Sequence, residues 1–199
     1  MTSPSNNLHA MFFLLIVFIS IPNLGLAARN IERTRLEFIK TSCGSTSYPQ
    51  LCFSSLSAHA SAIQNSPKLL ANTALSVTLN NAKTTSASME TLLHGHGPTP
   101  REIGAMKDCV EEMHDSIDQL RNSLQEMNQF KGSDFGLMIS DVQTWVSAAL
   151  TDEDTCTDGF AGNAMNGNLK NEVRVRIVNI AHLTSNALAL INSYAALHG

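Results

Sequence analysis

Residues 103–127 of this 199-residue chain read IGAMKDCVEEMHDSIDQLRNSLQEM and show the clearest helical periodicity in the sequence. Eight apolar residues lie there at alternating intervals of three and four: Ile103, Met106, Val110, Met113, Ile117, Leu120, Leu124 and Met127. Such intervals are typical of a helix that buries one stripe in a bundle. Pro98 and Pro100, which precede the stretch, favour a helix start, and Gly132 favours a helix end.

Three further segments outside this stretch are helical in pattern. Ser66 and Pro67 suit an N-cap and first residue of a helix whose apolar side chains are Leu75, Leu79, Ala82, Met89 and Leu93. A shorter helix, capped by Ser133 or Asp134, has the apolar residues Phe135, Ile139, Val142, Val146 and Ala149. The last stripe is interrupted only by Thr184 and comprises Val173, Ile177, Ile180, Thr184, Ala187, Ile191 and Tyr194.

These four helices are joined by short connections at residues 95–100, 132–133 and 151–168. Short connections favour antiparallel neighbours, so the sequence predicts an all-α, up-down-up-down four-helix bundle over residues 66–199. Residues 29–65 are also helical in pattern but too few to fold alone, and we expect them to form an N-terminal helical hairpin attached to the bundle.

The apolar run MFFLLIVFI at residues 11–19 is the candidate targeting segment. It is far shorter than the roughly 20 residues that span a bilayer. The small residues Gly25, Ala27 and Ala28 follow it, as before a signal-peptidase cut, although only the N-terminus and His9 can supply positive charge ahead of it. We expect residues 1–28 to be a signal peptide, cleaved after Ala27 or Ala28; the alternative is an uncleaved membrane anchor.

The four cysteines Cys43, Cys52, Cys109 and Cys156 indicate two disulfides in a secreted chain, for which three pairings exist. A local bridge between Cys43 and Cys52 is favoured because these residues flank the turn signal at Tyr48 and Pro49. Cys109 would then pair with Cys156. Zinc is disfavoured because the spacings are not those of zinc ligands.

Composition and charge disfavour nucleic-acid binding and favour a packed globular core. The chain carries 13 Lys and Arg against 17 Asp and Glu, a net charge of −4, and none of these residues lies within residues 1–28. A mildly acidic body disfavours nucleic-acid binding. With 43% hydrophobic and 15% charged residues, a packed core is expected. Because the apolar stripes of the bundle are complete without a partner, we expect the free protein to be a monomer.

No catalytic or metal-binding arrangement stands out. Glu111 and His114 form one Glu-x-x-His pair, half of the ligand set of di-iron bundles, but the sequence has no second copy. His94 and His96 lie in an expected loop, where solvent exposure explains them. The sequence has no G-x-S-x-G, glycine-rich phosphate loop or H-E-x-x-H, and disulfides would leave no free thiol. We therefore expect no enzyme activity, no cofactor and no metal.

Two polar surfaces are candidates for binding. Asp108, Glu111, Asp115 and Asp118, named here the acidic strip, recur at spacings of three and four and would form a row along one helix. The strip is either a solvated face or a docking surface whose affinity changes with protonation. The helix after Ser66 offers the same choice, exposure or a hydrogen-bonding interface, for Thr73, Ser76, Thr84, Thr85 and Ser88.

Three sets of motifs resemble the plant invertase and pectin methylesterase inhibitor family. They are Cys43-x-x-Thr46-x-Tyr48-Pro49-x-x-Cys52-x-x-Ser55-Leu56; Cys109-x-Glu111 with Asp115, Asp118 and Leu120; and Trp145-Val146-Ser147-Ala148-Ala149-Leu150-Thr151 with Thr155-Cys156-x-Asp158-Gly159-Phe160. The resemblance covers the chain from about Arg29 to the C-terminus. It implies a secreted four-helix bundle with an N-terminal hairpin, whose first cysteine pairs with the second and third with the fourth.

The resemblance favours the pectin methylesterase branch of the family. Invertase inhibitors resemble one another in a Pro-Lys-Phe loop, whereas the only Pro-Lys here, Pro67-Lys68, precedes Leu69 at a helix start. In the favoured branch the implied contact residues are Glu111, Asp115, Asp118, Thr155 and Asp158. Met113 and Ser116 depart from the usual Tyr and Ala.

The function expected from this resemblance is inhibition of pectin methylesterase in the cell wall space. The inhibitor would cover the substrate cleft in a reversible, non-covalent one-to-one complex. One alternative is inhibition of a cell-wall or vacuolar acid invertase. A further alternative is a bundle that binds a receptor or a small apolar ligand through a methionine-rich interior.

Overall fold

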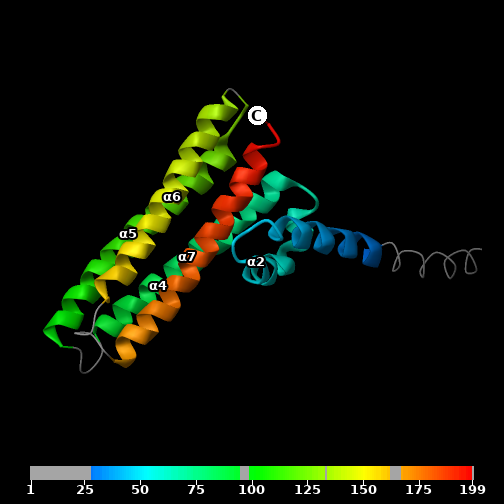
Figure 1. Ribbon diagram of the computed structural model, residues 1–199. Coiled ribbons are helices and arrows are strands. Elements are labelled where there is room, and N and C mark those ends of the chain that lie inside the picture. The colour runs from blue at the N-terminus through cyan, green and yellow to red at the C-terminus, as the bar shows by residue number, and fades with distance from the viewer. Residues whose placement is uncertain (1–27, 95–98, 133, 162–166, 199) are drawn as a thin grey trace, which may run out of the picture.

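The computed structural model describes residues 28–94, 99–132, 134–161 and 167–198. Four long helices form the bundle, and a shorter helical hairpin projects from one side of it (Figure 1). The bundle helices are α4 (Pro67–Leu93), α5 (Pro100–Gln129), α6 (Phe135–Gly159) and α7 (Asn168–Ala195). The hairpin comprises a helix at residues 28–43, then α2 (Pro49–Leu56), η1 (Ser57–His59) and α3 (Ala60–Ile63).

Each bundle helix packs against two others: α4 and α6 both contact α5 and α7. The described residues contain no strand, and the expected all-α bundle with an N-terminal helical hairpin is confirmed. The expected signal segment, residues 1–28, lies outside the described residues except for its last residue. None of the described helices is long and apolar enough to cross a bilayer.

The helix starts follow from local hydrogen bonds. The Ser66 hydroxyl accepts a bond from the Leu69 amide at 3.3 Å, and the Asp134 carboxylate accepts one from the Leu137 amide at 2.9 Å. Thr99 and Glu102 cap α5 reciprocally. Because Thr99 is the cap, Pro100 is the first helical residue, and the expectation that Pro100 precedes the helix is corrected by one position.

The third bundle helix is longer than the sequence interpretation proposed. The connection was expected to begin at residue 151, with Cys156 just past the helix, but α6 continues to Gly159 and contains Cys156. The reason is that the buried stripe of Val146 and Ala149 continues at helical spacing through Glu153 and Cys156. A carboxylate in the core position obscured this continuation in the sequence.

The two disulfides join neighbouring elements. Cys43 pairs with Cys52 across the turn of the hairpin, with their Cα atoms 5.5 Å apart. Cys109 of α5 pairs with Cys156 of α6, with Cα atoms 4.3 Å apart. No cysteine is free. The second bridge fixes the register between the two helices whose exposed surfaces form the candidate site.

A buried carboxyl group lies at the centre of the bundle. Glu153 has no exposed surface, and its Oε1 accepts hydrogen bonds from the hydroxyls of Ser116 at 2.8 Å and Thr184 at 2.9 Å. Burial raises the pKa of Glu153 to about 8, against the lowering effect of these two bonds. The polar interruption that Thr184 makes in the stripe of α7 is thus explained by its partner on α6.

Methionine fills much of the remaining core. The fully or almost fully buried methionines are Met89, Met106, Met113, Met127 and Met138. Together with leucine, isoleucine and alanine they form one continuous cluster with the inner face of the hairpin. These side chains therefore pack the bundle interior, the ordinary use of a flexible thioether.

One side-chain amide of α7 adds hydrogen bonds to the apolar packing between the hairpin and the bundle. Asn186 Nδ2 donates to the Tyr48 carbonyl at 3.0 Å, and Asn186 Oδ1 accepts from the Tyr48 amide at 3.0 Å. The Tyr48 ring also stacks on His182, with ring centroids 3.6 Å apart. Two hydrogen bonds from the Asn186 side chain to the Tyr48 backbone and one ring stack therefore reinforce the apolar contact between the N-terminal hairpin and α7.

Asn186→Ala should loosen this attachment. Losing both bonds costs about 1–3 kcal/mol of local stability, so backbone amides of the hairpin should exchange with solvent about tenfold faster or more. Hydrogen exchange at Cys52, whose amide donates to the Tyr48 carbonyl at 2.9 Å, reports this directly. Asn122→Ala, an exposed site on α5, is the matched control. Equal exchange in both variants would show that the Asn186 bonds do not hold the hairpin.

Candidate functional site

The acidic strip lies on the solvent side of α5. Asp108, Glu111, Asp115 and Asp118 are all exposed. From Glu111 to Asp118 the strip rises by two turns, about 10 Å. Asp118 also pairs with the Arg121 side chain one turn further on. The strip is therefore accessible along its length, with one carboxylate already paired to a cation.

The Cys109–Cys156 bridge brings residues of α6 beside the start of the strip. Thr155 and Asp158 flank Cys156 and are exposed, while Glu111 follows Cys109 by two residues. Asp118 lies about 13 Å further along α5, nine residues beyond Cys109. The five residues expected at the interface are thus all on the exposed surface of the α5–α6 pair, but Asp118 is remote from Thr155 and Asp158.

The sequence interpretation missed a carboxylate between the two helices. Asp152 of α6 is partly buried, and burial raises its pKa to about 6, with further contributions from the negative charges of Glu112 and Asp115. The buried Asp152 Oδ2 has no hydrogen-bond partner among the described residues. Asp152 therefore gains its negative charge as the pH rises through about 6, beside Glu112 and Asp115; these three residues are named here the carboxylate seam.

A signal for this seam exists in the sequence. Extending the helical stripe of Ala149 to Cys156 places Asp152 on the side of α6 that faces α5, because the disulfide fixes which side that is. The sequence interpretation instead placed the three residues from Asp152 to Asp154 in the connection at residues 151–168. The spacing was the better guide, since two of the three side chains are at least partly buried.

The Glu-x-x-His pair of α5 does not converge on a shared site. His114 Nε2 lies 3.2 Å from Glu90 Oε1 of α4, while Glu111 is an exposed member of the acidic strip. Across the described ranges no three potential metal-ligating side chains form a group. His94 is exposed, and His96 lies outside the described residues.

Comparison with known proteins shows what this architecture belongs to. The family described as Plant invertase/pectin methylesterase inhibitor matches residues 37–190. A 21 kDa protein of Daucus carota is 50% identical over 165 residues, which cover 81% of this chain and 86% of the relative. Pectinesterase inhibitor 11 of Arabidopsis thaliana is 43% identical over 189 residues, which cover 93% of this chain and 94% of the relative.

A solved structure has the same arrangement of helices. The crystal structure of mutant form A of a pectin methylesterase inhibitor from Arabidopsis superposes with a TM-score of 0.59 and 25% sequence identity. The match covers 77% of this chain and 95% of the solved chain. The sequence motifs, the helical bundle and the long match of the family lead to one conclusion: this chain belongs to the plant invertase/pectin methylesterase inhibitor family.

Proposed function

We propose that this protein inhibits pectin methylesterase by covering the substrate cleft of the enzyme in a reversible, non-covalent one-to-one complex. The observation that carries the proposal is the similarity over 93% of the chain to a protein named Pectinesterase inhibitor 11. The chain is an inhibitor and not itself an enzyme. Its place of action is the cell wall space. The apolar run at residues 11–19 would act as the signal that directs the protein there by secretion.

The proposed contact surface is the exposed side of the α5–α6 pair. It comprises Glu111, Asp115, Asp118, Thr155 and Asp158. A disulfide between α5 and α6 keeps these residues in one arrangement before binding, which lowers the entropy cost of forming a complex. The affinity should change between about pH 5 and 7, because the nearby Asp152 has a pKa of about 6. A constant affinity over this range would remove the carboxylates from the mechanism.

Reversing the charges of Glu111, Asp115 and Asp118 together to lysine should weaken inhibition of a plant pectin methylesterase at least about tenfold. The three residues are exposed, so the fold should survive while charge complementarity with the enzyme is lost. The measurement is the inhibition constant from titrations of enzyme activity. The matched control is lysine at Glu32 and Glu37, which are exposed and lie in the first helix of the hairpin, outside α5 and α6. Equal inhibition by both variants would place the contact on other helices.

Parallel titrations distinguish the esterase from an acid invertase as the target. Pro67 and Lys68 lie in the first turn of α4, and the Ser66 cap fixes that turn, so they form no free loop. We therefore expect saturable loss of esterase activity near one-to-one and no effect on invertase. Loss of invertase activity alone would overturn the assignment of the target.

A further inference from the structure

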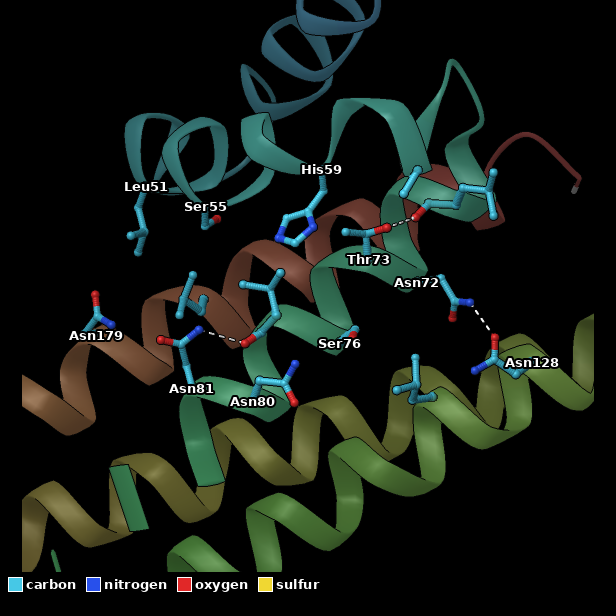
Figure 2. Close-up of a pocket in the computed structure, with 15 residues that line it drawn as sticks. Leu51, Ser55, His59, Asn72, Thr73, Ser76, Asn80, Asn81, Asn128 and Asn179 are labelled. Carbon is cyan, nitrogen blue, oxygen red and sulfur yellow. Dashed lines mark hydrogen bonds between the residues drawn. The ribbon is translucent and has the colours of Figure 1, made fainter. Parts of the chain in front are cut away.

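A groove of about 770 Å³ lies between the N-terminal hairpin and the bundle (Figure 2). The hairpin contributes Leu51, Ser55 and His59 to one wall, and α4 forms most of the other. From α5 only Leu124 and Asn128 reach the groove, and neither belongs to the acidic strip. The groove is therefore separate from the surface proposed to bind the esterase.

Uncharged hydrogen-bonding side chains dominate the lining. Nine of the fifteen lining residues are polar, none is Asp, Glu, Lys or Arg, and five are asparagines: Asn72, Asn80, Asn81, Asn128 and Asn179. Thr73 and Ser76 of α4 also line the groove, so part of the polar surface that the sequence analysis noted on α4 faces it. Each asparagine amide supplies an acceptor and two donors.

Many of these groups are not used within the protein. Asn72 Nδ2 donates to Asn128 Oδ1 at 2.6 Å, but the buried Asn72 Oδ1 has no partner in the part of the chain that the structure describes. Within the same part, the side-chain amides of Asn80 and Asn179 make no hydrogen bond. A buried acceptor without a partner is costly, so a ligand that donates a hydrogen bond to it would be stabilised.

We infer that this groove binds a short, uncharged oligosaccharide. A sugar hydroxyl both donates and accepts, which matches a wall of amides, and the C–H faces of sugar rings suit the leucines between them. An anionic ligand is disfavoured, because the lining has no Lys or Arg and the chain has a net charge of −4. A protein partner is disfavoured because the lining lacks the Trp, Tyr and Arg that anchor interface centres.

The test uses the disulfide-intact protein and follows the asparagine side-chain amide signals by NMR. Two of the probes are neutral sugars: a fully methyl-esterified oligogalacturonide and cellohexaose. The third probe is the same oligogalacturonide without its methyl esters, which is anionic. We expect at least one neutral probe to shift the Asn80 and Asn179 signals saturably, and the anionic form to bind at least tenfold more weakly. No shift with either neutral probe, or equal binding of both oligogalacturonides, would overturn the inference.

Two variants assign the binding to the groove. Asn80→Ala combined with Asn179→Ala removes two exposed amides and should weaken sugar binding about tenfold or more, with the fold intact. Asn171→Ala, exposed on the same helix as Asn179 but outside the groove, should bind sugar normally. Unchanged binding by the double variant would refute the site. An uncharged Gly-Ser peptide that shifts the same signals as strongly as sugar would also refute it.

This inference stands apart from the proposed inhibition of the esterase. The double variant should inhibit pectin methylesterase as well as the natural protein does, since no groove residue lies on the acidic strip. A protein that binds sugar but inhibits no esterase would keep the groove assignment and remove the proposed function. A protein that inhibits the esterase but binds no sugar would keep the proposed function and remove the groove assignment.

Discussion

Glu153→Gln should remove the largest part of the stability that the natural protein loses between about pH 4.5 and 8, leaving the smaller loss caused up to about pH 6 by the raised pKa of Asp152. The carboxyl of Glu153 is fully buried, and its pKa rises from an ordinary 4.5 to about 8 in the folded state. Below pH 4.5 both the folded and the unfolded chain hold this proton. Between these two values only the folded chain holds it, so the free energy of unfolding falls as the pH rises, by on the order of 5 kcal/mol in total.

Urea denaturation at about pH 4.5, 6 and 7.5 measures this effect. Glutamine has no proton to lose, and its carbonyl oxygen can still accept hydrogen bonds from the hydroxyls of Ser116 and Thr184. The free energy of unfolding of the variant, relative to that of the natural protein, should therefore increase as the pH rises. Asp108→Asn, which removes an exposed carboxylate of α5, should keep the natural pH dependence. If Glu153→Gln kept the natural slope, the loss of stability would arise from other groups.

Replacing Cys109 and Cys156 together by alanine should produce the other large effect. The bridge closes a loop with a sequence separation of 47 residues, and loop-closure entropy assigns it about 4 kcal/mol. For a chain of this size the melting temperature should fall by roughly 10 °C in non-reducing buffer. The double substitution is preferable to Cys109→Ala alone because it leaves no free thiol.

The hairpin bridge provides the comparison. Removing Cys43 and Cys52, which have a sequence separation of nine, should cost about 3 kcal/mol by the same relation. The bundle bridge should therefore matter more, and calorimetry of the two double variants compares them directly. An unchanged melting temperature after loss of the bundle bridge would contradict the assigned pairing.

The stripes of apolar residues made the bundle predictable, and the exceptions have physical causes. Helical spacing located all four long helices, since burial of one face per helix is what the spacing records. The end of α6 was missed because Glu153 occupies a core position and looks like a surface residue. Its partners Ser116 and Thr184 come from other helices, so no local pattern shows that this carboxyl group is buried.

The candidate surfaces also differ in whether the sequence alone could predict them. The acidic strip follows from residues on one helix, and the sequence alone was enough to place it. The carboxylate seam needs the register between α5 and α6, and the groove needs the hairpin docked on α4, so both depend on contacts between distant segments. Sequence periodicity describes one helix at a time and carries no information about such pairings.

The way Asn186 holds the hairpin has a consequence for divergence among related chains. Its side-chain amide hydrogen-bonds the main-chain N–H and C=O of Tyr48, and neither bond depends on which side chain residue 48 carries. Position 48 can therefore exchange its ring for another side chain at the expense of the stack on His182 alone. Proline is the exception, since it has no amide hydrogen to donate. A related chain that carries this asparagine could therefore vary residue 48 among residues other than proline without losing either hydrogen bond.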